Sequence, residues 1–256
     1  MTAKLTVCLT FDFDAESVQI RQLEEPGRVS KGRFAVRRGV PRILSLLRQH
    51  QIHGTFFTCG WVAENYPDLT KQIIAGGHEV AAHGYLHEYL DTLSIEEERN
   101  VHDRTEKALE SVGQRVRGFR APYWRLSQNT LGLLAERNYL YDSSLFDDDR
   151  PYTFQPSNSP KTLIEFPVEW FMDDWILFEE KQFSPTQAFG IWKSQIEAYV
   201  AMTDIHDNHR VLTLTCHPAC IGHAYRIRVL EKIIEYFKEY DVLFKRMDKV
   251  AEILKG

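Results

Sequence analysis

The sequence alternates strand-like and helix-like segments along almost its whole length. Short apolar runs typical of strands, such as residues 4–11 and 53–60, are separated by segments with helical periodicity, such as 40–50 and 67–77. Regular alternation of this kind favours parallel strands in one sheet, with the helices packed outside it. We therefore expect an α/β fold of about seven strands, closed into a barrel.

The remaining segments continue this pattern to the C-terminus. Further strands are expected at 78–83, 117–122, 139–144, 162–170, 210–217 and 241–244. Further helices are expected at 94–113, 127–138, 185–205 and 226–240. Ser94 and Glu97 form a capping-box pattern at the start of the first of these helices. The basic stretch 21–39, which follows the first strand, is interpreted as a long loop that either is simply solvated or covers a site.

Composition limits the class of protein. A chain of 256 residues with 43% hydrophobic residues can bury one large core, and a single α/β barrel commonly has this size. We expect one domain over residues 1–256. The net charge of −5 includes no long basic or acidic block, which argues against nucleic acid or a membrane surface as partner. A small molecule or a neutral oligosaccharide is favoured instead.

The same sequence indicates a cytoplasmic protein. No apolar run approaches the roughly 20 residues of a membrane span, and Asp12 comes too early for the apolar region of a signal peptide. The four cysteines, Cys8, Cys59, Cys216 and Cys220, show no CxxC spacing and are expected to be reduced core thiols.

Unusual polar residues fall at or just beyond the ends of the expected strands. They are Asp12, Asp14, His83, Arg120, Glu169, Asp173, Asp174 and His217. In a parallel barrel the C-terminal strand ends meet on one face, which is where active sites are found. These scattered segments therefore predict one candidate site.

A metal centre is the more specific interpretation of some of these polar residues. His83 and His87 have i, i+4 spacing, which brings two imidazoles to one side of a helical turn. A catalytic metal needs three protein ligands and an open position, and either Asp12 or Asp14 could supply the third ligand. The alternative is that each motif is only a polar loop after a strand.

Four motifs in this order resemble those of a known family. They are "TFDFDAE" (10–16), "HGYLH" (83–87), "RAPYW" (120–124) and "TCHP" (215–218). Together they are similar to the motifs of the polysaccharide deacetylases, the NodB-like group of carbohydrate esterase family four. The closest likeness is to its intracellular branch, which includes peptidoglycan-deacetylase-like proteins and cyclic-amide hydrolases. The resemblance implies a distorted (β/α)7 barrel and a divalent metal, usually zinc.

The resemblance also implies a role for individual residues. Asp14, His83 and His87 would bind the metal, Asp12 would be the general base paired with Arg120, and His217 would be the general acid. The backbone N–H of Tyr123 would contact the oxyanion. Asp173 or Asp174 would orient His217, and Trp124 and Trp175 would line the substrate groove.

Three positions depart from the common family pattern. Gly84 replaces a serine or threonine after the first metal histidine, so a hydroxyl that braces the loop is missing. Thr215 replaces a leucine that lines the acetyl pocket, which weakens the case for an acetyl substrate. His223 follows the His-Pro motif and is either a further functional histidine or a surface residue.

These observations support a zinc-dependent hydrolase of a non-peptide C–N bond. By resemblance, the first hypothesis is removal of an acetyl group from an N-acetylated sugar of the peptidoglycan or chitin type. The alternatives are hydrolysis of a cyclic imide or an allantoin-type cyclic amide, and a sugar- or metal-binding module without catalysis. By analogy with its branch, the protein is expected to be a homo-oligomer.

Overall fold

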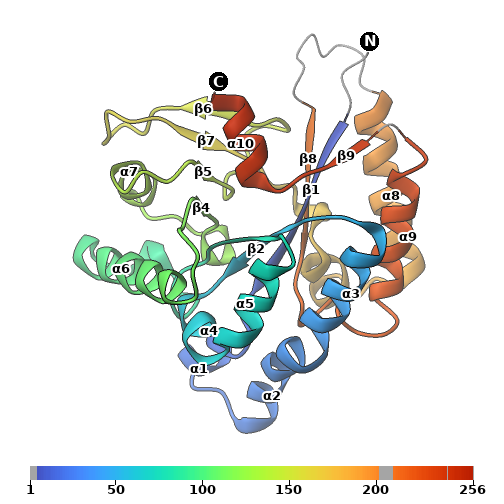
Figure 1. Cartoon of the computed structure of the whole chain (residues 1–256), viewed down its shortest axis with the longest axis horizontal. Coiled ribbons are helices and arrows are strands. Elements are labelled where there is room, and N and C mark those ends of the chain that lie inside the picture. Colours follow the sequence, from blue (N-terminus) through green and yellow to red (C-terminus); the bar gives the residue numbers. More distant parts are fainter. Residues whose placement is uncertain (1–4, 202–209, 241, 256) are drawn as a thin grey trace.

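One curled sheet forms the centre of the computed structural model, which describes residues 5–201, 210–240 and 242–255. Its strands are β1 (Leu5–Phe13), β2 (Thr55–Thr58), β3 (Glu79–Ala82), β4 (Gly118–Phe119), β5 (Tyr141–Asp142), β6 (Tyr152–Phe154), β7 (Leu163–Glu165), β8 (Val211–Cys216) and β9 (Val242–Phe244). The order across the sheet is β6-β7-β5-β4-β3-β2-β1-β8, and β9 also pairs with β1 (Figure 1).

The long strand β1 organises this sheet. One edge pairs with β8, while the other pairs with β9 at Leu5–Val7 and with β2 at Thr10–Phe13. All the pairs are parallel except β6–β7. The run of nine largely buried residues in β1 fits a strand covered on both faces, as parallel sheets require.

The barrel is distorted because the sheet does not close. At the β8 edge, the continuation is an isolated parallel bridge between Thr215 and Asp173. The expected α/β fold with a distorted barrel is confirmed, but the described strands leave the sheet open between β6 and β8, where closure was expected. The sheet also contains β6, which was not expected, because its three residues lie at an edge and are only partly buried.

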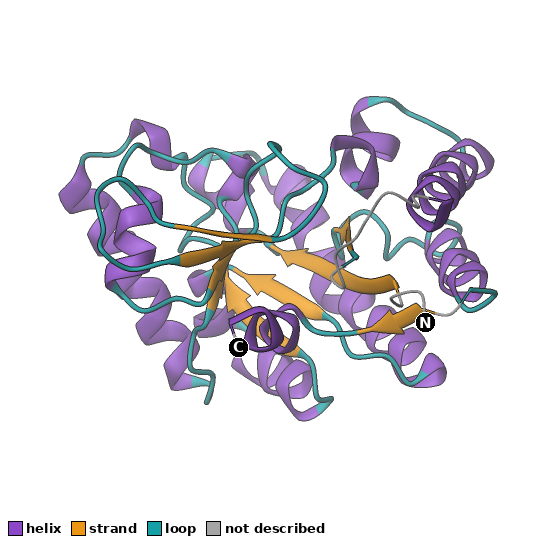
Figure 2. Ribbon diagram, turned by 90° about the horizontal axis from the view of Figure 1, so that it is seen from above, coloured by secondary structure: helices purple, strands orange, loops and turns teal. Residues whose placement is uncertain are grey.

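Helices surround the sheet, as the view from above shows (Figure 2). They are α1 (Ser17–Arg21), α2 (Pro26–Phe34), α3 (Val40–His50), α4 (Gly60–Asn65), α5 (Pro67–Ala75), α6 (Ile95–Ser111), α7 (Thr130–Glu136), α8 (Pro185–Ala201), α9 (Ile227–Phe237) and α10 (Met247–Lys255). Shorter or wider turns are η1 (Ala35–Gly39), η2 (Leu90–Thr92), η3 (Pro122–Trp124), η4 (Trp170–Met172) and η5 (Ile176–Glu180). None of the helices in the described part of the chain is long and apolar enough to span a membrane.

The interpretation of 21–39 as a loop was wrong, because most of this stretch is helical. Glu25 caps α2 by accepting the N–H groups of Gly27 and Arg28 at 2.6 and 2.8 Å, and Pro26 takes the first helical position. At Gly32, a Cβ atom would lie 2.2 Å from the carbonyl oxygen of Ala15, so only glycine allows α2 to pack so closely on the chain after β1.

Two helix termini test the expected boundaries. The capping box of α6 is confirmed: the Glu97 N–H donates to Ser94 Oγ, and Glu97 Oε2 accepts the Ser94 N–H at 2.8 Å. The helix expected at 185–205 is α8 up to Ala201, and the rest of its expected length lies outside the described residues.

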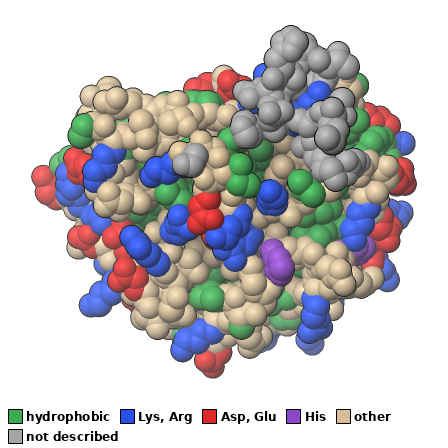
Figure 3. All heavy atoms as spheres, turned by 45° about the horizontal axis from the view of Figure 1, so that its top comes forward, with side chains coloured by type: hydrophobic (Ala, Val, Ile, Leu, Met, Phe, Trp, Pro, Cys, Tyr) green, Lys and Arg blue, Asp and Glu red, His purple; other side chains and the backbone are tan. Residues whose placement is uncertain are grey.

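Helix α10 closes the end of the barrel at which the strands begin. The N–H of Met247 donates to Thr55 Oγ1 at 2.9 Å, and the N–H of Asp248 donates to Glu79 Oε2 at 3.0 Å. Figure 3 brings this end toward the viewer and shows positive and negative side chains interspersed on it. The opposite end of the barrel, where the strands finish, is left for a cavity.

Candidate active site

The C-terminal strand ends surround a cavity of about 440 Å³. Asp12 lies near the end of β1 and Asp14 just after it, while His83 and His217 directly follow β3 and β8. Of the residues expected from the sequence, the cavity is lined by Asp12, Asp14, His83, His87, Tyr123, Trp124, Asp173, Trp175 and His217. The structure therefore brings the separate motifs together at one place.

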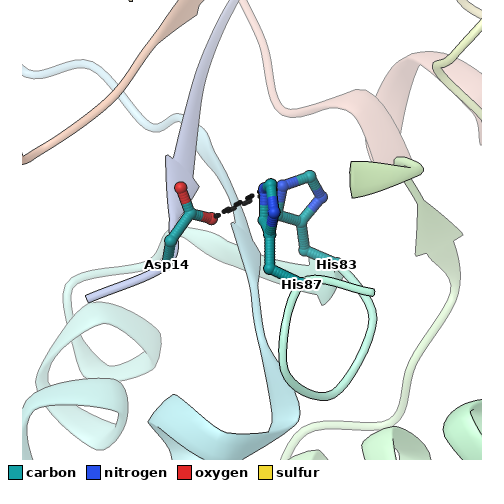
Figure 4. Close-up of side chains that lie close together, drawn as sticks. All are labelled: Asp14, His83 and His87. Carbon is teal, nitrogen blue, oxygen red and sulfur yellow. Dashed lines mark ion pairs between the residues drawn. The ribbon is translucent and has the colours of Figure 1, made fainter. Parts of the chain in front are cut away.

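Asp14, His83 and His87 form a compact cluster of possible metal ligands (Figure 4). Asp14 Oδ1 lies 3.5 Å from His83 Nε2 and 3.7 Å from His87 Nε2. Ligand atoms about 2.0–2.2 Å from a tetrahedral zinc are roughly 3.4 Å apart, so these separations suit such an ion. The Nε2 atom of His83 is buried without a hydrogen-bond partner among the described residues. The three side chains therefore fit a divalent metal.

The loop that carries both histidines is held in a shape suited to this role. His83 Nδ1 donates to the Arg120 carbonyl at 2.8 Å, which leaves the Nε2 lone pair free for a metal. Glu88 braces the loop by accepting the N–H groups of Tyr85 and Leu86 at 2.9 and 2.7 Å. Gly84 has φ +68°, and a Cβ there would lie 2.9 Å from Glu88 Oε2. Glycine therefore avoids backbone strain at this position.

The pKa shifts of the cluster agree with metal binding. Burial, together with the neighbouring His83, holds the pKa of His87 well below its usual range, so His87 is a neutral imidazole. Burial also raises the pKa of Asp14, although the neighbouring His83 and His217 act to lower it. A divalent ion bound to Asp14 would favour its ionised form.

Asp12 is held by a different cation. Its Oδ1 accepts a hydrogen bond from Arg120 Nη1 at 2.7 Å, and Arg120 is completely buried. Burial would raise the pKa of Asp12, but the Arg120 guanidinium, with His83 and His217, brings it below its usual value. Asp12 Oδ2 lies 3.9 Å from His83 Nε2, farther than Asp14 Oδ1. Of the two aspartates left open by the sequence, Asp14 is the better placed ligand.

His217 lines the cavity at the end of β8 and is oriented by Asp174. Asp174 Oδ1 accepts both the side-chain Nδ1–H at 2.8 Å and the backbone N–H at 2.9 Å of His217. His217 Nε2 lies 3.9 Å from Asp12 Oδ2. Burial would lower the pKa of His217, but the carboxylates of Asp173 and Asp174 raise it well above its usual value. This imidazole is therefore a proton donor at neutral pH.

The turn after Arg120 has a strained backbone. Tyr123 and Trp124 are consecutive non-glycine residues with φ of 55° and 54°. The phenol oxygen of Tyr123 accepts hydrogen bonds from Arg21 and Gln22, each at 3.3 Å, and its ring packs against His87 at 4.3 Å. Strained positions of this kind persist only where the surroundings fix them.

Aromatic rings form part of the cavity wall. Trp175 packs beside His217 with ring centroids 5.6 Å apart. Trp124 packs at 5.5 Å from Trp170, which also lines the cavity and was not identified from the sequence. Its position at the end of the apolar segment 162–170 was the available signal.

Helices α1 and α2 cover one side of the cavity. Val18, Gln19 and Gln22 line it from α1 and the residue that follows, and Arg28 and Lys31 line it from α2. Lys31 connects α2 to the part of the wall that contains Trp175. Its Nζ lies 2.8 Å from Glu179 and 4.4 Å from the centre of the Trp175 ring.

Five candidate residues from the sequence do not line the cavity: Arg120, Glu169, Asp174, Thr215 and His223. Thr215 is buried, its Oγ1 lies 3.4 Å from Thr10 Oγ1, and it does not line the cavity. Asp174 is completely buried behind His217. His223 stacks on Phe34 at 4.1 Å.

Comparison with known proteins places this arrangement in a family. Residues 2–141 match the model of the family described as polysaccharide deacetylase. A peptidoglycan deacetylase of Helicobacter pylori is 26% identical, over 94% of this chain and 92% of its own. A peptidoglycan deacetylase-like protein of Gibberella zeae is 29% identical, over 93% and 82%.

Solved structures agree with this result. A crystal structure of a Mycobacterium smegmatis protein assigned to the polysaccharide deacetylases is 34% identical, covers 100% of this chain and 91% of its own, and has a TM-score of 0.86. The PuuE allantoinase has the same fold, with a TM-score of 0.88 at 24% identity and coverage of 98% and 90%. The chain belongs to the polysaccharide deacetylase family, whose members are metal-dependent hydrolases of C–N bonds other than peptide bonds.

Proposed function

We propose that the protein uses zinc to hydrolyse the acetamide group of an N-acetylated amino sugar. The observation that carries the proposal is the placement of two chemically different groups beside Asp12. His83 Nε2 of the ligand cluster and Nε2 of His217, which Asp174 orients, each lie 3.9 Å from Asp12 Oδ2. An amide carbonyl bound here would lie next to the metal ligands, the base Asp12 and the acid His217.

Asp14, His83 and His87 would hold the metal at the edge of the cavity. A divalent ion there would supply a Lewis acid for the carbonyl and would lower the pKa of a water molecule. Two imidazoles and one carboxylate are ligands that zinc accepts, which is why we propose zinc.

The side chains of the chain carry the proton transfers. Asp12, kept ionised by Arg120, takes a proton from the attacking water as the new C–O bond forms. His217 Nε2–H gives a proton to the leaving nitrogen as the C–N bond breaks, which releases a free amine and acetate. Asp174 holds the His217 ring in the tautomer with its Nδ1 protonated.

The negative charge that develops on the carbonyl oxygen needs a donor. The Tyr123 backbone N–H is proposed for this role, since the strained turn next to His87 fixes its position before substrate binds. Trp124, Trp170 and Trp175 offer flat apolar faces to a sugar ring.

The size of the cavity limits the substrate. A volume of about 440 Å³ lies within the range of small-molecule pockets, roughly 300–1,000 Å³. The α1–α2 cover also occupies one side of it. A single sugar or the end of a short oligosaccharide fits this shape better than the interior of a long polymer.

The same cover favours a second candidate, a small cyclic amide such as an imide or an allantoin-like ring. A ring-opening hydrolysis uses the same base and acid, but the leaving nitrogen, now an amide or urea nitrogen, and the new carboxylate remain in one molecule. Thr215 does not separate the two candidates, because it lies outside the cavity lining.

Mass spectrometry on a mixed panel tests both functions. Zinc-loaded protein is incubated with N-acetylglucosamine, chito-oligosaccharides, peptidoglycan fragments, hydantoin, allantoin and succinimide, with Asp12→Asn as the control. A product lighter by an acetyl group, absent with the variant, supports the deacetylase. A product heavier by one water supports ring opening instead, and absence of both would contradict hydrolysis of either class.

A further inference from the structure

Two buried carboxyl groups lie behind the cavity, at the ends of neighbouring strands. Asp142 ends β5 and Glu165 ends β7, and their Cα atoms are register partners in the parallel pair. Both residues have 0% exposure, and neither lines the cavity. Both carboxyl groups accept hydrogen bonds from Ser144, so they lie beside each other. A hydrogen bond between two carboxyl groups requires a proton on one of them.

The remaining contacts leave one oxygen of each carboxyl group without a donor. Asp142 Oδ1 accepts the hydroxyl of Ser144 at 2.9 Å, and Glu165 Oε1 accepts the N–H groups of Ser144 and Leu145 at 3.0 Å each. Among the described residues, no donor reaches Asp142 Oδ2 or Glu165 Oε2. These two oxygens are therefore left to share one proton. Burial raises the pKa of Asp142 to about 6, and burial with the charge of Asp142 raises that of Glu165 well above its usual range.

Ser143 and Ser144 connect this pair to the catalytic groups. Ser144 Oγ, while donating to Asp142, accepts the Ala121 N–H at 2.9 Å. The carbonyl oxygen and the hydroxyl of Ser143 accept Arg120 Nε and Nη2 at 3.1 and 3.0 Å. Arg120 is the partner of Asp12, and Ala121 begins the strained turn that contains Tyr123. Every step of this connection is buried.

We propose that Asp142 and Glu165, sharing one proton, are positioning residues for the reaction. They fix the Ser143–Ser144 corner, and this corner fixes the guanidinium of Arg120 and the turn at Tyr123. A pair with a single negative charge accepts three hydrogen bonds at this corner, and it avoids the repulsion of two adjacent carboxylates. The proposal rests on the proposed amide hydrolysis only for its kinetic readout.

Ser144→Ala breaks the connection with the smallest change of volume. The matched control is Ser159→Ala, another buried serine, whose hydroxyl accepts the Lys161 N–H at 3.2 Å and does not line the cavity. The measurements are kcat, KM, zinc affinity and amide hydrogen exchange of the peptide that contains Ala121–Trp124. We expect kcat to fall by about 10- to 100-fold in Ser144→Ala, as for a displaced catalytic group, with KM and zinc affinity unchanged.

Hydrogen exchange separates this proposal from the proposed function. Faster exchange at Ala121–Trp124 in Ser144→Ala, with unchanged exchange in Ser159→Ala, is expected whether or not a substrate is known. Unchanged exchange would overturn the proposal even if the enzyme is an active deacetylase. Wild-type protein that turns over no amide would instead contradict the proposed function.

Glu165→Gln tests the shared proton itself. A glutamine amide N–H can donate to Asp142 Oδ2, as the shared proton does, while its oxygen still accepts the two backbone N–H groups. We expect Glu165→Gln to keep kcat within about threefold of wild type and to keep slow exchange at Ala121–Trp124, whereas Glu165→Leu loses both. If Glu165→Leu does not fold, Glu165→Gln alone still tests the proposal. A loss of kcat in Glu165→Gln as large as that in Ser144→Ala would overturn it.

Discussion

Buried carboxylates are present at both ends of the barrel, but their surroundings differ. At the end closed by α10, Glu79 accepts hydrogen bonds from Thr55, Tyr141 and the Asp248 N–H at 2.8, 2.9 and 3.0 Å. At the cavity end, by contrast, buried atoms have no hydrogen-bond partner among the described residues. They are His83 Nε2, His87 Nδ1, Asp173 Oδ2 and Asp174 Oδ2.

The two ends of the barrel also differ in backbone strain. Four non-glycine residues at the cavity end have positive φ: Ala15, His87, Tyr123 and Trp124. At the other end, Gln51 and Asn138 also have positive φ, but each follows the end of a helix, where this conformation is common. Unpaired polar atoms and strained backbone both cost stability, and they persist where they serve binding or catalysis. The comparison indicates that one end of the barrel stabilises the fold and the other performs the chemistry.

Removal of the metal should produce the largest effect on the cavity end. We expect a chelator to abolish turnover, because the ion would supply the Lewis acid and the activated water. Added zinc should restore activity, and the thermal midpoint should rise on zinc addition, since the ligand set binds only when folded. Full activity of protein shown to be metal-free by elemental analysis would contradict the assignment of Asp14, His83 and His87.

Replacement of the base should have the next largest effect. Asp12→Asn keeps an oxygen that accepts from Arg120 but loses the proton acceptor, so kcat should fall by about 10²–10⁴ while zinc stays bound. The control is Asp68→Asn, an exposed residue of α5. Loss of both zinc and turnover in Asp12→Asn would instead make Asp12 a metal ligand, and retained turnover would remove Asp12 as the base.

Asp174→Asn should change the pH dependence rather than abolish activity. His217 must be protonated, and the neighbouring Asp173 and Asp174 carboxylates raise its pKa. Removal of one charge lowers that pKa, so the alkaline fall of kcat should move to lower pH by one unit or more, within the roughly 1–3 units of an adjacent charge. A pH–rate profile identical to wild type would remove His217 as the acid.

The smallest effect on activity is expected at the α10 end. Burial, with the charge of Asp248, raises the pKa of Glu79 to about 7 from 4.5. Because the folded pKa is raised, the corresponding stability is complete below about pH 4.5 and is lost as the pH rises through about 7. Glu79→Gln should flatten the pH dependence of the thermal midpoint over this window and leave kcat unchanged. A large loss of kcat in this variant would contradict the division between the two ends.

The sequence predicted the features that depend on periodicity along the chain. Apolar strands that end in Asp12, His83 or His217 predict both a parallel sheet and the convergence of these residues on one face, and the structure brings them together. The expected α/β fold was confirmed for the same reason, since alternation of two periods is visible in a single sequence.

The features that the sequence did not predict depend on tertiary contacts. Helix α2 has a polar sequence, and its position depends on Gly32 packing against Ala15. Asp142 and Glu165 lie 23 residues apart in sequence, and their contact arises only because β5 pairs with β7. Propensity and periodicity contain no information on such pairings.

The α1–α2 cover has a consequence for how new activities could arise on this scaffold. It is one continuous stretch, residues 15–35, inserted between the strand that carries Asp12 and helix α3. The groups proposed for proton transfer, Asp12 and His217, lie outside this stretch. Exchange of this single segment between relatives would therefore change the substrate entrance. The residues proposed for proton transfer would stay the same.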